Sequence, residues 1–280
     1  MNKFVSNICN LSRKYEGKKF HNKALSYLKK IGQIDFFIEV LNENLKSIDF
    51  LAKTWSMYEM PYLVIYKDEK IELRFNLFFP TAEKKSDSAS HLIHHHGNSI
   101  LSTYVVYGSG YQTIEFDSKF ILNYDGTAKL KKIKDKKLTI GQYNCVDILS
   151  PHVISNVSNP TITLNLWSFE NDTIEKERVH FYISGGNFNY IFENKFLDLS
   201  ESINNGNIPI DHEKVFCYYI QKYKLESSFI ERILKNPNIN ERWEKNLKKI
   251  LKNKLINCPI YDNKSLILNK EFSFEQLRLI

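Results

Sequence analysis

His91-Leu92-Ile93-His94-His95-His96-Gly97-Asn98 holds four of the eight histidines of this chain. Side chains alternate between the two faces of a β-strand, so His94 and His96 share one face and His95 points to the other. Such a pair can hold one ion from a single strand, and neutral imidazole suits iron, zinc, copper and nickel. Because two ligands need at least one more, the stretch predicts a metal-binding strand completed by another segment of the chain.

The sequence around these histidines, from Pro61 to Glu193, is rich in short β-type segments. Turn formers such as Ser109-Gly110 and Asp125-Gly126 separate several of them. About ten short strands without intervening helices indicate an all-β sandwich or barrel. The predicted strands are 62–66, 71–79, 91–96, 101–107, 111–116, 129–133, 139–148, 161–167, 178–183 and 190–192.

Both ends of the chain show helical spacing instead. Apolar residues recur three or four positions apart over 22–55, with a break at Gly32, and again in segments between 215 and 255. We therefore expect three parts: an N-terminal helical segment (1–60) packed on the barrel, a β-barrel with the metal site (61–200), and a C-terminal helical segment (201–280).

The formal net charge of +7 is concentrated near the C-terminus, since residues 221–254 hold ten Lys or Arg and four Glu, an excess of 6. Lysines at helical spacing without an aromatic pattern are typical of a solvated helix face, so nucleic acid is not an expected partner. No stretch approaches the roughly 20 apolar residues of a membrane span, and the N-terminus does not resemble a signal peptide. The four cysteines form no ligand or disulfide pattern. These features predict a cytoplasmic protein without a membrane partner.

The spacing of the histidines resembles the two signature motifs of the cupin superfamily. His94-x-His96 is followed after eleven residues by Gly108, and Gly141 is followed by His152 and Asn156. The resemblance implies a double-stranded β-helix (jelly-roll) barrel, mainly β with helical ends, and pairing as a homodimer. The departures are Ser88 at the first glycine, Asp147 and Leu149 at a proline and a glycine of the second motif, and Leu101 at the metal-binding glutamate. The implied metal site is therefore His94, His96 and His152 without a carboxylate.

The sequence after His152 is similar to that of cysteine dioxygenases, a family of three-histidine cupins. Pro151-His152-Val153-Ile154-Ser155-Asn156, then Pro160, then Leu164-Asn165-Leu166-Trp167-Ser168 resembles their run H-x-V-x-N, proline, L-x-L-Y-S, and Phe75-Asn76-Leu77 also resembles the family. The likeness covers about Arg74 to Ser168. It implies a mononuclear Fe(II) site that uses O2 on a small molecule bound to the metal.

Three departures from that family concern its substrate. Trp167 stands at its active-site tyrosine, and Leu101 stands at the cysteine that is crosslinked to that tyrosine. The arginine that binds the carboxylate of cysteine is missing from Leu63-Val64-Ile65, although Arg74 could replace it from the next strand. We therefore do not expect free cysteine to be the substrate.

The expected function is that of a non-haem Fe(II) oxygenase or dioxygenase acting on a small metal-coordinating molecule. The expected site residues are His94, His96 and His152 for the metal, with Trp167, Tyr104 and Arg74 in the catalytic site. Alternation places Tyr104 opposite Leu101, or on the metal side if a bulge intervenes near Gly97. Two alternatives stay open: a redox-inert cupin that uses zinc, nickel or manganese for isomerase, hydrolase or lyase chemistry, and a binding cupin without turnover.

Overall fold

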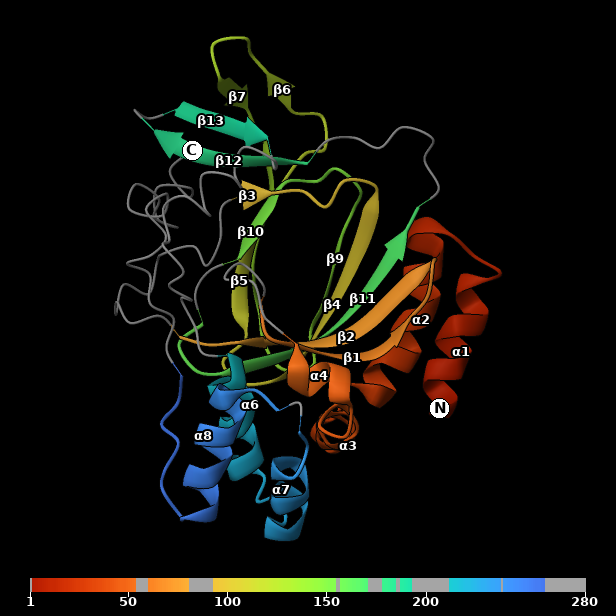
Figure 1. Cartoon of the computed structure of the whole chain (residues 1–280). Coiled ribbons are helices and arrows are strands. Elements are labelled where there is room, and N and C mark those ends of the chain that lie inside the picture. Colours follow the sequence, from red (N-terminus) through yellow and green to blue (C-terminus); the bar gives the residue numbers. More distant parts are fainter. Residues whose placement is uncertain are drawn as a thin grey trace.

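The computed structural model describes residues 2–53, 60–80, 93–154, 157–170, 178–184, 187–192, 212–237 and 239–259. Helices lie at both ends of the described chain and strands lie between them (Figure 1). The helices are α1 (Lys3–Ser12), α2 (Gly17–Ile31), α3 (Ile34–Asn44), α4 (Ile48–Ala52), α6 (His212–Lys222), α7 (Ser227–Leu234) and α8 (Glu241–Leu251). The strands are β1 (Tyr62–Lys67), β2 (Ile71–Phe78), β3 (Ile93–His94), β4 (Ser99–Tyr107), β5 (Tyr111–Phe116), β6 (Ile121–Leu122), β7 (Thr127–Lys129), β8 (Lys132–Leu138), β9 (Tyr143–Val146), β10 (His152–Ile154), β11 (Thr161–Phe169), β12 (Val179–Ser184) and β13 (Asn187–Phe192).

The strands form two antiparallel sheets in a jelly roll. One sheet has the order β1-β2-β11-β4-β9, and the other has the order β6-β7-β13-β12-β3-β10-β5-β8. From β2 to β5 and again from β8 to β11, successive strands alternate between the two sheets. In each sheet, strands of the first group therefore alternate with strands of the second group. This order, β2-β11-β4-β9 facing β3-β10-β5-β8, is the double Greek key of a jelly roll. The predicted fold class, a double-stranded β-helix (jelly-roll) barrel with helical ends, is confirmed.

The largest apolar core lies outside the barrel, between the five-stranded sheet and the helices. In α2 the buried positions Phe20, Ala24, Leu28 and Ile31 follow helical spacing and face the sheet. The sheet contributes every second residue of β2, Ile71, Leu73, Phe75 and Leu77, to the same cluster. Each such large side chain stabilises the fold by about 1.5–3 kcal/mol when fully buried. Figure 1 shows α1 and α2 beside this sheet and α6 to α8 at one end of the barrel.

The residues between the two sheets are largely polar. The other four positions of β2, Glu72, Arg74, Asn76 and Phe78, turn into the barrel because their neighbours pack on the helices, and the first three of them are polar. The facing strand β5 contributes Tyr111, Thr113 and Glu115, while its Ile114 and Phe116 join a separate outer cluster. Buried interior-facing side chains on the other strands include Thr103, Asn144, His152, Thr163 and Asn165. A purely structural barrel would hold apolar side chains here, so this interior is suited to a polar ligand.

Several sequence-based boundaries were wrong. The predicted strands 129–133 and 139–148 are replaced by β7, β8 and β9, because Gly141, with φ of +82°, lies in a turn inside the second run. The predicted strand 91–96 is described only from Ile93, and β3 ends at His94. His91, Ser88 and Asn156 lie outside the described residues. No helix in the described ranges is both long and apolar enough to cross a membrane.

Candidate metal centre

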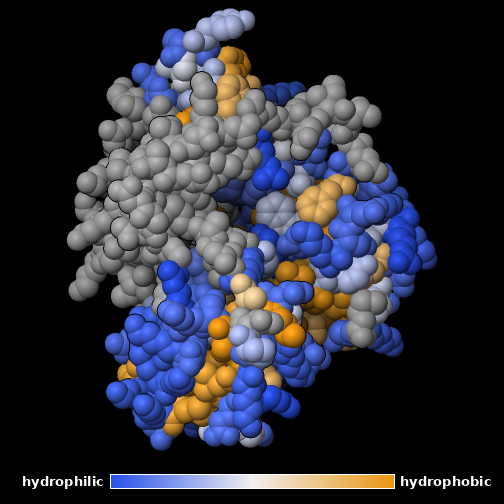
Figure 2. All heavy atoms as spheres, viewed as in Figure 1, coloured by the Kyte–Doolittle hydropathy of each residue, from blue (hydrophilic) through white to orange (hydrophobic). Residues whose placement is uncertain are grey.

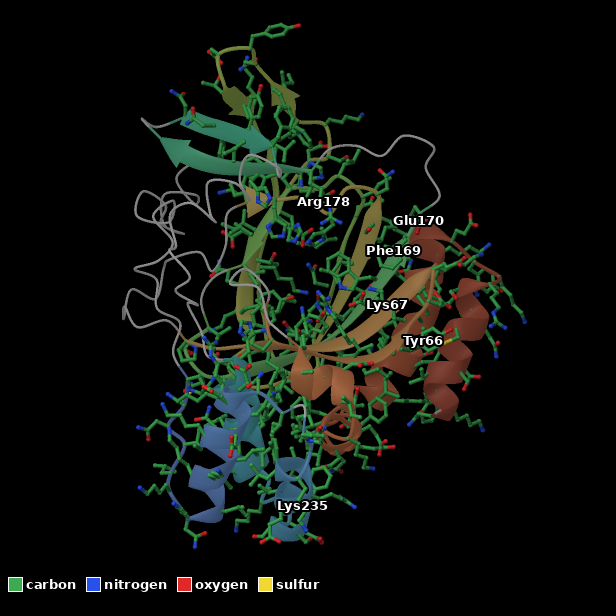
Figure 3. All side chains as sticks on the ribbon, in the orientation of Figure 1. Tyr66, Lys67, Phe169, Glu170, Arg178 and Lys235 are labelled. Atoms are coloured by element: carbon green, nitrogen blue, oxygen red, sulfur yellow. The ribbon has the colours of Figure 1, made fainter. Side chains whose placement is uncertain are left out.

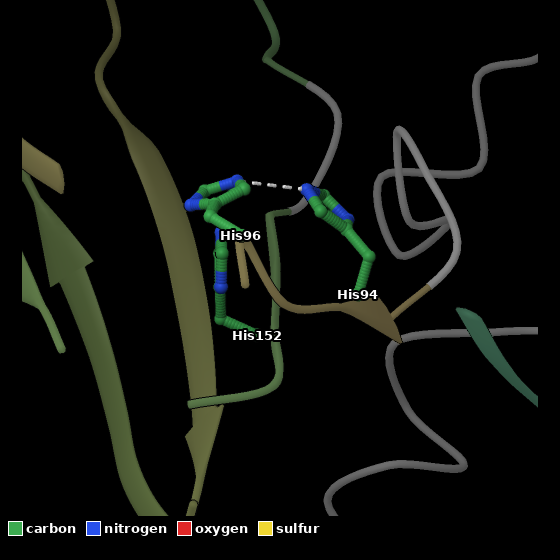
Figure 4. A group of neighbouring side chains, drawn as sticks. All are labelled: His94, His96 and His152. Atoms are coloured by element: carbon green, nitrogen blue, oxygen red, sulfur yellow. Dashed lines mark hydrogen bonds between the residues drawn. The ribbon is translucent and has the colours of Figure 1, made fainter. Parts of the chain in front are cut away.

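Three histidines, from the end of β3, from the segment just after it and from β10, lie close together (Figure 4). His94 ends β3, His96 follows it by two residues, and His152 begins β10 directly opposite His94 in the antiparallel register. Their ring centroids are 4.5–5.0 Å apart. One possible ligand atom from each ring lies within 4.8 Å of those of the others. The structure thus brings together the three residues that the sequence predicted as metal ligands.

The donor geometry fits a transition metal ion. Nε2 of His94 and Nε2 of His96 are 3.1 Å apart. Two nitrogens bound at about 2.1 Å to one ion are separated by about 3.0 Å at a right angle and about 3.4 Å at a tetrahedral angle. The observed separation lies in that interval, so these two nitrogens, which are within hydrogen-bonding distance of each other, can bind one cation together.

Hydrogen bonding and burial prepare the rings for binding. Nδ1 of His152 lies 3.2 Å from the carbonyl oxygen of Ser150, and because a carbonyl can only accept, this nitrogen carries the proton. Nε2 of His152 is therefore the ligand atom, in the arrangement usual for metal-bound histidine. Burial, followed by the neighbouring His152 and His94, lowers the pKa of His96 well below its ordinary value. His96 is neutral at physiological pH, which is the form that binds metal.

His95 points away from this cluster, as strand alternation predicts. The backbone N–H groups of Gly97 and Val179 lie 3.1 Å and 3.2 Å from its two ring nitrogens, and its ring stacks on Phe120. His180 is paired with His94 in the sheet, but its ring centroid lies 6.0 Å from that of His94 and it is not part of the three-histidine group.

Trp167 forms one wall of the site. Its ring centroid is 4.4 Å from that of His96, and its Nε1 is buried without a hydrogen-bond partner among the described residues. Leu101 lies beside Trp167 in register on β4, on the same face of the sheet and 8% exposed. No carboxylate belongs to the metal-binding group in the described chain. Glu115 is next to His152 in register, but Lys134 and Asn144 occupy its oxygens.

Arg74 lies on the other side of Trp167. Its guanidinium carbon is 5.5 Å from the Trp167 ring centroid and 4.5 Å from that of Tyr62. One terminal nitrogen donates to Glu72 at 2.8 Å, and Glu72 is also bound by Lys67 at 3.0 Å. Nε of Arg74 is buried without a partner in the described residues. Two cations around one carboxylate leave a net positive charge beside the tryptophan.

The structure does not bring Tyr104 to the histidines, which corrects its predicted place in the site. Tyr104 lies on the helix-facing side of β4, and a Cβ added to Gly32 would fall 2.5 Å from its ring carbons. The end of α2 therefore sits directly on this ring, and only glycine fits at that position. The alternation of β4 is regular here, so the bulge that could have turned Tyr104 inward is absent from this part of the strand.

Of the polar positions with which β2 faces the interior, only Arg74 was predicted from the sequence as a site residue. The alternation of β2, with Glu72, Arg74 and Asn76 between apolar residues, was a visible signal for one polar and one apolar face. Figure 2 shows a recess in the middle of the viewed face, with hydrophilic side chains along part of its border. In the same orientation, Figure 3 places Arg178, Phe169 and Lys67 around this part of the molecule.

We expect Leu101→Glu to add a carboxylate ligand. The new side chain would stand beside Trp167, whose ring touches His96, and would tighten metal binding at least about tenfold. It would also reduce any metal-dependent turnover by filling an open position. Metal titration of wild-type, Leu101→Glu and the uncharged control Leu101→Gln checks this. Equal metal affinity and activity in all three proteins would exclude Leu101 from the surroundings of the ion.

Comparison with known proteins gives likeness in structure only. No family model and no curated protein sequence matches this chain. A cupin superfamily protein from Desulfitobacterium hafniense DCB-2 is 7% identical over 44% of this chain and 87% of its own, with a TM-score of 0.27. KdgF from Halomonas sp. is 11% identical over 43% and 89%, with a TM-score of 0.28. The DMSP lyase DddQ from Ruegeria pomeroyi DSS-3 is 11% identical over 42% and 51%, with a TM-score of 0.28. Each likeness spans less than half of this chain, and the jelly-roll fold is shown by the chain's own strand order.

Proposed function

We propose that this protein is a metal-dependent cupin enzyme, a mononuclear non-haem Fe(II) oxygenase that acts on a metal-coordinating small molecule other than free cysteine. The observation that carries this proposal is the group of three histidines in a polar barrel, which no carboxylate of the described residues joins. Three neutral ligands leave the charge of the ion undiminished, which favours an anionic substrate group. The resemblance of the segment around His152 to cysteine dioxygenases supports iron and O2.

The residues of the chain have separable roles in this proposal. His94, His96 and His152 would hold Fe(II), which supplies Lewis acidity and one-electron chemistry with O2 when bound. Trp167 would form an aromatic wall against the bound substrate and can donate a hydrogen bond through Nε1, but it cannot move a proton as a tyrosine can. Arg74 would attract a second anionic group, because its Nε is unpartnered among the described residues and the Lys67-Glu72-Arg74 cluster carries a net positive charge.

The proposal is tested by elemental analysis of protein purified without added metal, followed by O2 uptake after loading with Fe(II). We expect about one metal ion per chain and O2 consumption that depends on an added carboxylate or thiol compound. Zinc, nickel or manganese in the purified protein, with no O2 uptake by the iron form, would favour the redox-inert alternative. Metal binding without turnover of any kind would favour a binding cupin.

We expect poor oxidation of cysteine by the wild-type protein. β1 provides apolar side chains and no arginine over Leu63-Val64-Ile65, and Trp167 stands at the position of the active-site tyrosine of the family that this segment resembles. Loss of one charge-assisted contact of about 3 kcal/mol corresponds to about a 100-fold lower kcat/KM. Spectroscopic titration of the Fe(II) protein with cysteine and with small thiols, together with O2 consumption, measures the preference. Efficient cysteine oxidation would refute it, and a Trp167→Tyr variant shows whether the tyrosine alone restores activity.

A further inference from the structure

We propose that the barrel interior between the three histidines and its closed end binds the uncharged, hydrogen-bonding tail of the substrate, and that Asn76 and Thr113 recognise this tail. The inference rests on the proposed function for the other end of the substrate, which binds the metal. It is carried by the order of side chains along two facing strands and by buried polar atoms without partners.

The closed end of the barrel is an apolar plug. Phe78 of β2 and Tyr111 of β5 stack across the interior with ring centroids 5.7 Å apart, and Val105, Leu138 and Val157 complete the cluster. Because Phe78 and Tyr111 come from opposite sheets, the register of both strands can be followed from this contact toward the metal.

One step of two residues along each strand leads to Asn76 on β2 and Thr113 on β5. Both keep the inward orientation of the plug residues, since side chains two apart share a face. Thr113 is opposite Ile154, and the next step along β5 leads to Glu115, opposite His152. Asn76 and Thr113 therefore line the layer between the plug and His152.

Asn76 and Thr113 hold polar atoms that nothing in the described chain satisfies. Oδ1 of Asn76 and Oγ1 of Thr113 are buried without a hydrogen-bond partner in the described ranges, and the residues are 7% and 1% exposed. Their polar neighbours are engaged, because the Thr163 hydroxyl donates to Asn165 at 2.7 Å. Buried polar atoms are normally paired, so these two atoms point to a ligand partner.

The surrounding charges indicate that this partner is neutral. The nearest charged side chains along the two strands are engaged, because Glu115 is bound by Lys134 and Asn144, and Arg74, the next inward residue of β2, donates to Glu72. No formal charge belongs to Asn76, Thr113 or Thr163 themselves. A hydroxyl or amide group can donate to Oδ1 of Asn76 and accept from the Thr113 hydroxyl. Since two residues of a strand span about 6.7 Å, the tail reaches this layer with a chain of about four atoms beyond the metal-binding group.

The test uses two thiols of equal length on Co(II)-loaded protein, which reports thiolate binding by its absorption band without turnover. The probes are 4-mercaptobutan-1-ol and pentane-1-thiol, which differ by a hydroxyl in place of a methyl group. We expect wild-type protein to bind the alcohol at least about tenfold more tightly than pentane-1-thiol. This preference is expected to disappear in Thr113→Val and in Asn76→Leu.

The melting temperature of the metal-free protein distinguishes a hydroxyl that contacts a ligand from one that stabilises the fold. Thr113→Val removes an unpaired hydroxyl and is expected to leave the melting temperature of the metal-free protein unchanged or raised. The matched control Thr163→Val removes a hydroxyl that bonds Asn165 and is expected to lower it.

An equal preference for the two thiols in wild-type protein, no binding of either thiol, or a Thr113→Val variant destabilised as much as Thr163→Val would overturn the proposal. The expected thiol preference without O2 uptake by the iron-loaded protein would instead contradict only the oxygenase function and leave the tail site standing.

Discussion

His152→Ala is expected to reduce the metal content of the purified protein from about one ion per chain to less than about 0.1. His152 is the one ligand that comes from β10, and its Nε2 is held toward the other two rings by the hydrogen bond of Nδ1 to Ser150. Since loss of a group that only orients a ligand costs about 10- to 100-fold in affinity, loss of the ligand itself costs more. Elemental analysis and the Co(II) spectrum measure this change.

The control for this variant is His180→Ala. His180 pairs with His94 in the sheet and lies near the site, yet it is outside the three-histidine group. The His180→Ala variant should therefore retain one metal ion per chain. Metal binding also stabilises the folded state, by about 2.7 kcal/mol when the free metal concentration is 100 times the Kd. Added metal should therefore raise the melting temperature of the wild-type protein and of His180→Ala, but not that of His152→Ala. Stoichiometric metal in His152→Ala would place the ion elsewhere.

A second large effect is expected from His21, which is fully buried between α2 and the five-stranded sheet. Its Nδ1 lies 2.6 Å from Oγ of Ser102, and its Nε2 lies 2.9 Å from Oγ of Ser168. The Ser168 hydroxyl donates to Glu170, so Nε2 of His21 carries the proton and Nδ1 accepts from Ser102. The whole network requires the neutral ring.

Acid should therefore weaken the fold through His21. Burial lowers its pKa from 6.5 to about 4. Between these values the unfolded chain binds a proton that the folded protein does not, so the stability present above pH 6.5 is lost as the pH falls to 4. The expected loss is about 3 kcal/mol, at 1.36 kcal/mol for each pKa unit.

The measurement is urea unfolding of the metal-free protein from pH 7 to pH 4. His21→Gln is the matched variant, because an amide can accept from Ser102 and donate to Ser168 without titrating. Other groups, including the metal-binding histidines, titrate equally in both proteins, so the difference in pH dependence isolates His21. If both proteins lose stability equally between pH 6.5 and 4, His21 is already protonated in the fold or its pKa is not lowered.

Much of the barrel could be predicted from local pattern. The long strands β2, β4, β5 and β11 alternate or carry β-branched and aromatic residues, and each was anticipated within two residues of its observed ends. The two-residue or three-residue strands β6, β7 and β10 were missed, since so short a segment has no period to detect. The first helix, α1, was missed as well, and its start is fixed by the Asn2 side chain, which accepts from the N–H of Phe4.

The sequence by itself determined that His94 and His96 share a face, because a strand has a period of two, and its family resemblance indicated His152 as their partner. Only the tertiary structure decided which neighbours these rings have. The register that sets His152 opposite His94, and the approach of the two sheets that sets Trp167 against His96, depend on contacts between segments far apart in the chain.

Which face of β2 points into the barrel also depends on the tertiary structure. The alternation of β2 separates Glu72, Arg74 and Asn76 from its apolar residues, but it does not state which set faces the other sheet. In an ordinary sandwich the apolar set would do so. Here the terminal helices cover the outer face and bury the apolar set, as they bury Tyr104, so the polar set is left to line the barrel. The affinity of the apolar face for those helices is the physical reason that this barrel has a polar interior.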